Sequence, residues 1–462
     1  MEPPVAYPAV SPAPRLGTID LLLASAVQEL AEITEAPGVA ACVVVGGQVV
    51  ASYATGLADT RSLAAMTSTT TFDMASQTKL MTAVAMVALA ERGTLALDDP
   101  ITNHLESRLF RADERLAQIS ILDLLLHRAG FTHATRRNFA RPLHTSGLST
   151  MRRRSASVPV SHDGPIAIDY TPRTSSQYSN VGAALAAEIV ARNFGSTYRE
   201  AVERLVLHPL SMADTHLYGR ARPGGRRHRR AQRLLPLELH PRWIGIAGGI
   251  STVGDLARLI SPYTGVPDAL SLVPVASLQE WSSHSLLGGE AVGHVVGWRL
   301  EQQPHGVILH QAGTRPGLSV KAMVAPADRI GCVLLANKTC RLEIHGVAER
   351  LMDRLRGLER NHAGGRADLL AGSYSIAGSP LRNPTFWLDS GGRIDVHHVE
   401  NATDVTFGRN GGRFPVTCRD GEYGIQRRGA WIPMRMAIDR ETAHDTLALG
   451  GPYTGLILTR LP

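Results

Sequence analysis

The first regular pattern in the chain is a set of apolar residues at helical spacing over residues 19–33, which predicts an amphipathic helix ending before Pro37. Two strand-like apolar runs follow, at residues 39–45 and 48–53, with Gly46 and Gly47 between them. A glycine pair supplies the positive backbone angles of a two-residue turn, so these runs predict a β-hairpin.

The next apolar run has helical spacing up to Gly93 and begins at the tetrapeptide Ser76-Gln77-Thr78-Lys79. Residues three apart lie on one face of a helix, so the side chains of Ser76 and Lys79 are expected to be neighbours. A second helix is predicted over residues 181–192, directly after Tyr178-Ser179-Asn180 and before Gly195.

After residue 290 the period changes from helical to strand-like, and a last helix is predicted at about residues 343–358. The strand-like runs lie at residues 294–301, 307–311, 318–324 and 330–336. An early hairpin and late strands can join into one antiparallel sheet flanked by the first and last helices. The middle third then forms a helical lobe, and a cleft between lobe and sheet holds Ser76.

Three parts of the chain follow from these patterns. Residues 1–16 are rich in proline and are expected to be a flexible N-terminus, and residues 17–360 make the α+β domain. Beyond residue 360 the apolar runs become short and are separated by glycine, so residues 366–462 predict a small all-β C-terminal domain, either a sandwich or a barrel.

Composition places the chain among globular proteins, because 462 residues with 44% hydrophobic side chains can bury a large core. No apolar stretch approaches the roughly 20 residues that cross a bilayer. The N-terminal residues include an acid and several prolines in place of a secretory signal, and the four cysteines have no metal or redox spacing. These features favour the cytoplasm, with no membrane association.

The net charge of +7 is modest but unevenly distributed, since arginines crowd residues 220–233 and residues 152–154. No aromatic residues alternate with these arginines as a nucleic-acid groove would require, so nucleic acid is not expected as a partner. A solvated loop is the favoured interpretation of the clusters, and contact with an acidic carrier protein or ligand stays open.

Lys79 has a chemical significance that an arginine would lack. Only three of the 48 basic side chains are lysine, and a buried amine can lose its proton near neutral pH whereas a guanidinium cannot. A hydroxyl one helical turn from such an amine is a candidate nucleophile, and the first turn of a helix also favours a developing oxyanion. Taken alone, the tetrapeptide is more readily explained as a helix cap followed by a solvated lysine.

Tyr178 and Asn180 make a second polar cluster at a helix start. A phenol beside an ammonium is stabilised as phenolate, so Tyr178 and Lys79 could share a proton and pass it between Ser76 and a leaving group. Asn180 would hold Lys79 and hydrogen-bond a substrate carbonyl. A helix cap with a half-buried tyrosine is the alternative for this cluster.

These two motifs and the late segment His310-Gln311-Ala312-Gly313 resemble, in order and spacing, the serine β-lactamase and penicillin-binding-protein superfamily, and most closely its class C β-lactamase and esterase branch. Shorter segments that resemble the same branch lie at residues 97–100, 124–131, 208–212 and 247–252. The resemblance covers roughly residues 20–358 and implies a β-lactamase-like fold.

By that resemblance Ser76 is the nucleophile, Lys79 and Tyr178 are the general base and acid, and Asn180 orients them. The resemblance also assigns the oxyanion donors to the backbone N–H groups of Ser76 and Gly313. It makes His310 the replacement for the lysine of the third motif, where it could meet a substrate carboxylate or polarise Tyr178, and it makes Gln77, Gln311 and Ala312 substrate-binding residues.

The third motif departs from the family pattern, because Ala312 stands where glycine is usual and Gly313 comes one residue later. The register of this motif is therefore open by one residue, and the charge of His310 is open between about pH 5 and 8. His127 and His208 lie in segments that look structural, and for both we favour a core histidine. No sequence motif suggests a metal or an organic cofactor.

The resemblance implies a serine hydrolase or acyltransferase that acts on an amide, ester or thioester carbonyl through an acyl-Ser76 intermediate. The expected partner is a small-molecule or peptidyl acyl substrate in intracellular metabolism; the oligomeric state is not indicated. One alternative is a penicillin-binding-protein-type thioesterase or transacylase that cyclises or amidates its acyl donor, a branch with a lipocalin-like C-terminal domain. The other is a non-catalytic binding module with the β-lactamase fold.

Overall fold

The computed structural model describes most of the chain up to residue 357 and eight strands beyond it. The described ranges are residues 16–106, 113–131, 168, 170–174, 176–217, 244–265, 281, 292–303, 306–357, 372–375, 393–399, 402–407, 413–419, 422–427, 430–438, 445–449 and 456–460. The predicted flexible N-terminus and both arginine clusters lie outside these ranges, except for residue 16.

An eight-stranded sheet organises the molecule, and each neighbouring pair of strands in it is antiparallel. Its order is β3-β2-β1-β11-β10-β9-β8-β7. The strands are β1 (Gly38–Val45), β2 (Gln48–Asp59), β3 (Ala64–Ala65), β7 (Val292–Val295), β8 (Trp298–Gln303), β9 (Gly306–Arg315), β10 (Leu318–Ala325) and β11 (Ile330–Ala336). Pairing of β1 with β11 joins the two ends of this region, as the sequence predicted.

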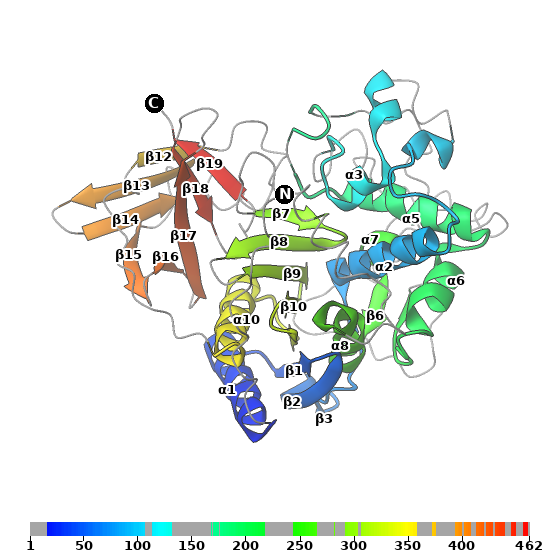
Figure 1. Ribbon diagram of the computed structural model, residues 1–462. Helices are drawn as coiled ribbons and strands as arrows, with labels where there is room; N and C mark the ends of the chain where they lie inside the picture. Colours follow the sequence, from blue (N-terminus) through cyan, green and yellow to red (C-terminus); the bar gives the residue numbers. More distant parts are fainter. Residues whose placement is uncertain are drawn as a thin grey trace, which may run out of the picture.

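One face of the sheet is covered by the first and last helices of this region, α1 (Leu16–Thr34) and α10 (Arg341–Leu355), which lie side by side (Figure 1). Their apolar side chains form one core with alternate residues of the central strands, among them Val43, Ile308 and Cys332. The predicted hairpin is confirmed: Gly46 and Gly47 both have positive φ, and Val45 pairs with Gln48.

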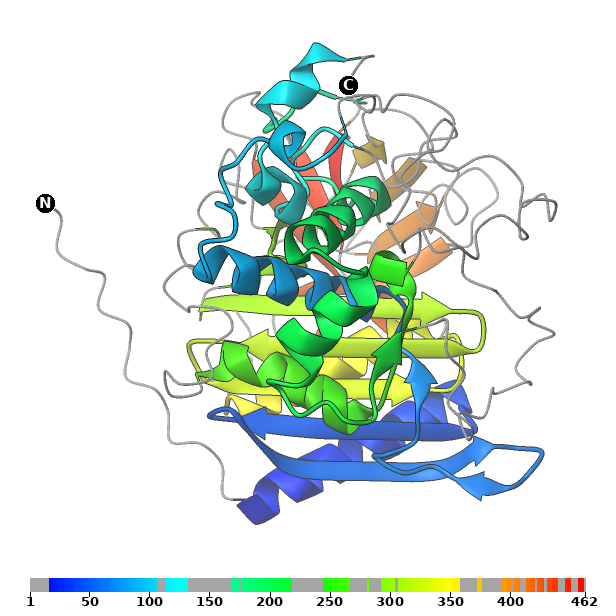
Figure 2. The same cartoon turned by 90° about the vertical axis from the view of Figure 1, so that its right-hand side faces the viewer.

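The other face carries the helical lobe, which lies in front of the strands in Figure 2. Its helices are α2 (Thr78–Glu91), α3 (Ile121–Leu125), α5 (Asn180–Phe194), α6 (Tyr198–Val202), α7 (Ile244–Ala247) and α8 (Val253–Ile260), with the short turns η2 (Ile101–Asn103), η4 (Glu114–Gln118), η7 (Glu203–Leu207) and η9 (Ser261–Thr264). A small sheet of β4 (Phe72–Asp73), β6 (Gly249–Ser251) and β5 (His216–Leu217) lies beside them.

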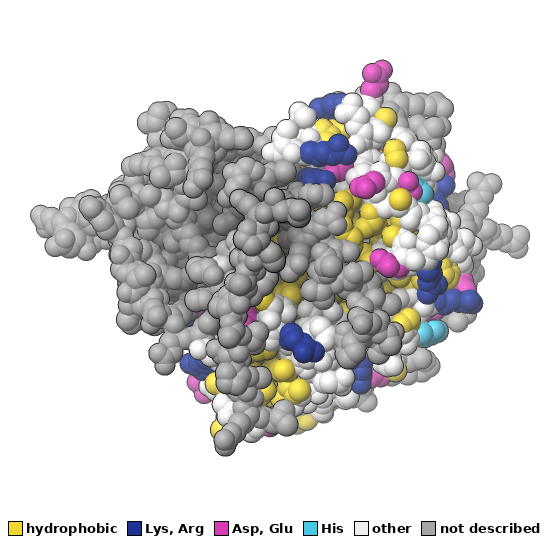
Figure 3. All heavy atoms as spheres, viewed as in Figure 1, with side chains coloured by type: hydrophobic (Ala, Val, Ile, Leu, Met, Phe, Trp, Pro, Cys, Tyr) yellow, Lys and Arg dark blue, Asp and Glu magenta, His cyan; other side chains and the backbone are white. Residues whose placement is uncertain are grey.

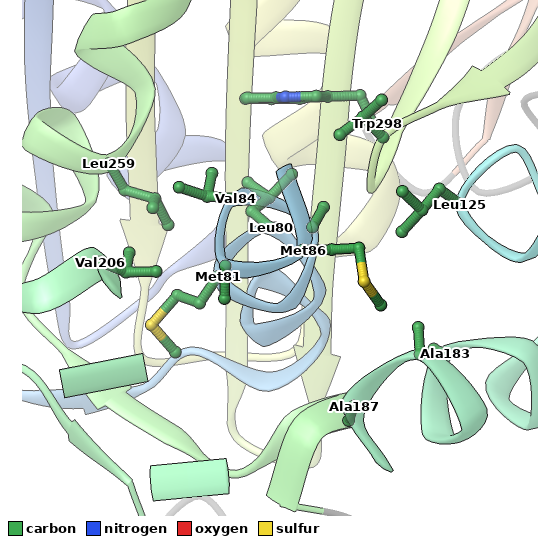
Figure 4. Close-up of a cluster of buried hydrophobic side chains, with 14 of the residues drawn as sticks. Leu80, Met81, Val84, Met86, Leu125, Ala183, Ala187, Val206, Leu259 and Trp298 are labelled. Atoms are coloured by element: carbon green, nitrogen blue, oxygen red, sulfur yellow. The ribbon is translucent and has the colours of Figure 1, made fainter. Parts of the chain in front are cut away.

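Helix α2 runs through the centre of this lobe, and every residue from Thr78 to Leu89 is buried. In Figure 4 it is surrounded by side chains from several elements, including Leu125, Ala183, Val206 and Trp298. A helix that is enclosed on all sides is apolar all round, which explains why its sequence shows an almost continuous apolar run.

The predicted strand at residues 294–301 is wrong in one respect, because the structure divides it into the hairpin β7–β8. The turn lies at Val296 and Gly297, which have φ values of 44° and 84°. A valine carries no turn signal, so the apolar pattern concealed the reversal. The Gly297 turn fits against α2, since a Cβ there would lie 3.1 Å from the carbonyl oxygen of Lys79.

The C-terminal strands form a closed antiparallel barrel in which β12 pairs with both β13 and β19. Its strands are β12 (Gly372–Ser375), β13 (Arg393–Val399), β14 (Ala402–Phe407), β15 (Arg413–Arg419), β16 (Glu422–Arg427), β17 (Ala430–Ile438), β18 (Asp445–Leu449) and β19 (Leu456–Arg460). The sequence left a sandwich and a barrel open. That this barrel is a separate domain, with boundaries at 360 and 366, stays a prediction.

Two sequence expectations concern the environment of the protein. No helix within the described ranges is both long and apolar enough to cross a membrane. Cys42, Cys332 and Cys340 are buried free thiols, and burial raises the pKa of each to about 12, so they behave as small apolar residues. A cytoplasmic location stays a prediction.

Candidate active site

Ser76 lies in a 3₁₀ turn, η1 (Ala75–Gln77), that leads directly into α2. The preceding residue, Ala75, has φ of 46°, an uncommon conformation for a residue with a Cβ. Two hydrogen bonds hold this turn: Asp73 Oδ1 accepts from Ala75 N at 2.7 Å, and Thr78 Oγ1 donates to Ala75 O at 2.7 Å. Ser76 as a whole residue is half-buried.

The amine of Lys79 is buried next to that hydroxyl. Lys79 Nζ lies 3.1 Å from Ser76 Oγ and donates a second hydrogen bond to Ile246 O, also at 3.1 Å. The side chain is only 3% exposed. Burial lowers the pKa of Lys79, Tyr178 partly opposes this through its charge and a hydrogen bond, and the charge of Arg315 lowers the pKa further. The amine is thereby moved toward the neutral form that a base needs.

Tyr178 completes a three-residue cluster, because its hydroxyl donates to Ser76 Oγ at 3.0 Å. Lys79 Nζ also lies 4.9 Å from the centre of the Tyr178 ring. The phenol is positioned by α5, whose N-cap is Ser179, the side chain of which accepts from Gly182 N. Residues that are 102 positions apart in the sequence thus meet at one hydroxyl.

Two histidines support the Tyr178 ring. The ring centre of His127 lies 4.9 Å from that of Tyr178 and 4.9 Å from that of His294. His127 is buried, as predicted, and its Nδ1 accepts from the backbone N–H of Ser179 at 3.1 Å. His208, by contrast, is exposed, so the core-histidine prediction was wrong there.

Asn180 is the first residue of α5 and lies two positions from Tyr178. Within the described ranges no hydrogen bond joins Asn180 to Lys79, and the buried Oδ1 of Asn180 has no hydrogen-bond partner. A buried acceptor of this kind is costly unless something satisfies it. The predicted contacts of Asn180 with Lys79 and with substrate stay predictions.

Strand β9 brings the third motif to Ser76. Pairing of β8 with β9 ends at Arg299 and His310, so β9 has an open edge beyond His310. Gln77 Nε2 donates to Gln311 O at 2.7 Å, which shows that this edge faces the Ser76 turn. The N–H and C=O of one strand residue point to the same side, and the direction repeats every second residue, so the N–H of Gly313 also faces the turn.

Gly313 is required here by the close approach of two backbones. A Cβ on Gly313 would lie 2.6 Å from Met74 O and 3.2 Å from the Cβ of Ala75. The alternation along β9 and this contact both favour Gly313, and not Ala312, as the backbone donor near Ser76. Ala312 is exposed.

The two glutamines predicted to bind substrate are instead buried and engaged with protein atoms. Gln77 is fully buried, and its side-chain amide is the donor to Gln311 O. Gln311 is 3% exposed; its Nε2 donates to Gly297 O at 2.7 Å, and its Oε1 accepts from Ala312 N at 3.1 Å. These contacts tie the Ser76 turn, β9 and the β7–β8 turn together.

His310 has different neighbours from those expected. Its ring is on the α10 side of β9, where Lys321 Nζ lies 2.8 Å from Nδ1, the ring centre of His345 is 5.6 Å away, and Glu301 Oε2 is 3.9 Å from Nε2. Burial and the charges of Lys321 and His345 lower the pKa of His310 well below its usual value. The imidazole is therefore shifted toward its neutral form.

Three contributors to the site escaped the sequence analysis. Ile246 contributes a carbonyl, which no side-chain motif can reveal, although it adjoins the family-like segment 247–252. His294 belongs to the hairpin that was predicted as one strand. Arg315 lies two residues beyond Gly313 on the same face of β9 and pairs with Asp73 at 2.9 Å; strand alternation from Gly313 was the available signal.

Within the described part of the chain, no group of three or more His, Cys, Asp or Glu side chains is arranged to hold a metal ion. The polar atoms around Ser76 are an amine, a phenol and backbone groups, which is a donor set for proton transfer.

An antiparallel sheet with a helical lobe, and a hydroxyl flanked by a buried amine and a phenol, define the class of serine acyl-transfer enzymes. Residues 23–355 match the Beta-lactamase family model, and the chain belongs to that family.

Known proteins agree with this family. Esterase EstB of Burkholderia gladioli is 33% identical over 189 residues, 38% of this chain and 46% of its own length. The D-alanyl-D-alanine-carboxypeptidase/endopeptidase AmpH of Escherichia coli (strain K12) is 28% identical over 200 residues, 41% of this chain and 48% of its own. Both relatives are hydrolases by name.

This chain spans about half the length of these two relatives. The octameric penicillin-binding protein homologue from Pyrococcus abyssi has a TM-score of 0.57 and 18% identity, and the match covers 95% of this chain and 99% of that one. At that identity the likeness is one of fold.

Proposed function

We propose that the protein is a serine hydrolase or acyltransferase that attacks an amide, ester or thioester carbonyl through an acyl-Ser76 intermediate. The observation that carries the proposal is the position of Ser76 Oγ, 3.1 Å from Lys79 Nζ and 3.0 Å from the Tyr178 hydroxyl. Two proton-transferring groups within hydrogen-bond distance of one serine hydroxyl are what nucleophilic catalysis requires.

In the acylation step the neutral amine of Lys79 takes the proton of Ser76 as Oγ attacks the carbonyl carbon. The backbone N–H groups of Ser76 and Gly313 receive the developing oxyanion. Tyr178 gives its proton to the leaving group and regains one from the ammonium of Lys79, so the site returns to its starting charge. The Ile246 carbonyl holds the amine in place through both stages.

In the second step an acceptor with a lone pair, either water or an amine, attacks the acyl-enzyme. The same two groups remove its proton and return one to Ser76 Oγ, by the reverse of the first step. Water as the acceptor makes the enzyme an esterase or peptidase, whereas an amine makes it an acyltransferase. By name, EstB is an esterase and AmpH a carboxypeptidase/endopeptidase, and either reaction could use this site.

A thioester donor that is cyclised or amidated is the second candidate. The closed eight-stranded barrel after the catalytic region favours it, because the thioesterase branch resembled by the sequence also has a lipocalin-like C-terminal domain. A donor of this kind is delivered by an acidic carrier protein. Basic and acidic side chains are interspersed on the described part of the face in Figure 3, so that part carries no uniformly basic surface for such a carrier. The arginines of residues 152–154 and 220–233, which lie outside the described residues, remain the sequence candidates for this contact.

The test is a panel of acyl donors mixed with the purified protein and followed by intact-mass spectrometry and product release. The panel contains a p-nitrophenyl ester, an N-acetylcysteamine thioester, a peptide ending in D-Ala-D-Ala, a cephalosporin and a fluorophosphonate. Donors that label and then turn over identify the substrate class, and adding an amine separates hydrolysis from transfer.

Ser76→Ala is the matched control, since it removes one oxygen atom and should abolish every adduct. Labelling of the wild type that persists in Ser76→Ala contradicts the proposal. A wild type that no donor labels contradicts it as well, and would favour the binding-module alternative.

A further inference from the structure

Arg315 joins two segments that have no direct sequence connection. From the end of β9, its Nε pairs with Asp73 Oδ2 at 2.9 Å and its Nη2 donates to Ala247 O at 2.6 Å. The side chain is only 18% exposed, so these contacts are partly shielded from water. The guanidinium is rigid and planar, so the ion pair of Nε with Asp73 and the hydrogen bond from Nη2 to Ala247 O together fix the distance between the two segments, although within the described residues Nε itself makes no hydrogen bond.

Each of these two acceptors belongs to a segment that directly contacts the nucleophile or the base. Asp73 uses its other oxygen, Oδ1, to accept from Ala75 N, and thereby holds the positive-φ residue that precedes Ser76. Ala247 directly follows Ile246, whose carbonyl accepts from Lys79 Nζ. The nucleophile and the base thus each depend on a segment that Arg315 holds.

We propose that Arg315 is a positioning residue for the Ser76 and Lys79 pair. Through Asp73 it fixes the segment that carries the nucleophile, and through Ala247 it fixes the segment whose carbonyl accepts from the amine. It also places a permanent positive charge near that amine. The inference rests on the proposed function, in which Lys79 is the base for acylation of Ser76. It assigns Arg315 no contact with substrate.

The charge of Arg315 has a measurable consequence for Lys79. A neighbouring positive charge disfavours the protonated amine, and Arg315 accordingly contributes to the lowered pKa of Lys79, after the larger effect of burial. Loss of this charge raises the pKa of Lys79, so the amine becomes neutral only at higher pH.

The experiment measures the rate of fluorophosphonate adduct formation on Ser76 between pH 5.5 and 9.5 for the wild type, Arg315→Met, Arg315→Lys and Asp73→Asn. We expect Arg315→Met to acylate up to about 10²-fold more slowly at pH 7, the loss associated with misplacing a reacting group. In Arg315→Met, the pH below which the rate falls should move to a higher value. Arg315→Lys keeps the positive charge but loses the planar guanidinium, so it should lower the rate without moving that pH, here called the acid limb of the profile.

Arg192→Gln is the matched control. Arg192 also pairs with a buried carboxylate, Glu188, but near the C-terminal end of α5, about 18 Å along the helix from Asn180. It should acylate at the wild-type rate with an unchanged pH profile. Circular dichroism melting checks that each variant is folded; if Arg315→Met is unfolded, Arg315→Lys and Asp73→Asn decide the rate effect.

A merely structural Arg315 would reduce the amount of folded protein, and the remaining molecules would react at the normal rate with an unshifted acid limb; that result overturns the inference. So does normal acylation by folded Arg315→Lys and Asp73→Asn. Failure of the proposed function is a different result, because the wild type itself would then form no adduct that depends on Ser76.

Discussion

At the scale of single residues, the site depends on one amine that is kept out of water. Water would hold Lys79 as an ammonium, whereas burial lowers its pKa, an effect that Tyr178 partly opposes and the charge of Arg315 reinforces. The other two lysines differ from it: Lys321 is buried on the far side of the sheet, and Lys338 has a side chain that is 39% exposed. Only Lys79 is within reach of Ser76 Oγ.

Lys79→Arg should therefore lower the rate of acylation by about 10²- to 10⁴-fold, the usual contribution of a general base, because arginine keeps the charge but cannot lose its proton. Stopped-flow measurement of product release, with intact-mass detection of the adduct, checks this. Lys338→Arg, the same change at the surface, should acylate normally. Near-normal acylation by a folded Lys79→Arg would mean that another group removes the proton from Ser76.

The sequence predicted the contents of this cluster better than its surroundings. Ser76, Lys79 and Tyr178 meet because each lies at a helix start, and helix starts can be recognised from periodicity and caps. His310 could not be assigned in the same way. Side chains alternate between the two faces of a strand, so an error of one residue in the register places a side chain on the wrong face. The Ile246 carbonyl was invisible, because a backbone acceptor can belong to any residue type.

At the scale of elements, the most demanding contact is the approach of β9 to the turn before Ser76. Gln77 and Gln311 draw the two segments together through a 2.7 Å hydrogen bond. Gly313 allows the two backbones to approach this closely, since any side chain there would collide with the Met74 carbonyl. The same strand supplies Arg315 from the next position on that face.

Gly313→Ala should consequently separate β9 from the Ser76 turn, because its Cβ would lie 2.6 Å from Met74 O. We expect acylation to fall by about 10²-fold and stability by about 1–3 kcal/mol, the range for an overpacked interior. Adduct kinetics and urea unfolding measure the two effects. In Gly254→Ala, whose nearest contacts would be at 3.7 Å, both should be nearly unchanged; equal behaviour of the two variants would contradict the close approach.

At the scale of the whole molecule, the sheet keeps two buried amines on opposite faces. Lys79 serves the lobe side, whereas Lys321 lies with His310 on the α10 side. Burial lowers the pKa of Lys321 to about 7, opposed by Glu349 and Glu301 and reinforced by Arg299. The fold therefore carries the desolvation cost of a second buried amine, which the proposed reaction does not use.

This second amine makes stability depend on pH. The pKa of Lys321 is about 7 in the folded chain and near 10.4 when unfolded, so between these values the unfolded chain binds the extra proton. Lys321 should therefore make stability rise with pH by up to about 1.4 kcal/mol per pH unit, most clearly between about pH 7 and 8.5, above which the buried cysteines, with pKa values of about 12, oppose the rise. Urea unfolding of Lys321→Met should lack this rise, and that of Lys338→Met should retain it. An identical slope in the wild type and Lys321→Met would show that Lys321 is not responsible.

The architecture was predictable from the sequence where a pattern had a single structural meaning. Glycines 46 and 47 indicated a hairpin, and the apolar strands at both ends of the region indicated one sheet. The reversal at Val296 and Gly297 was concealed, because β-branched residues favour strands and Gly297 stood alone within an apolar run.

The enclosure of α2 has a consequence for how this enzyme can be altered. Since every residue from Thr78 to Leu89 is surrounded, a substitution that enlarges or reshapes the helix must disturb its neighbours in the lobe, and mutant libraries directed there should yield mostly unfolded proteins. Ala312 is exposed but pairs with Lys321, so its side chain is on the α10 side of the sheet, away from Ser76. Directed evolution of new selectivity should therefore avoid α2 and has little to gain at position 312.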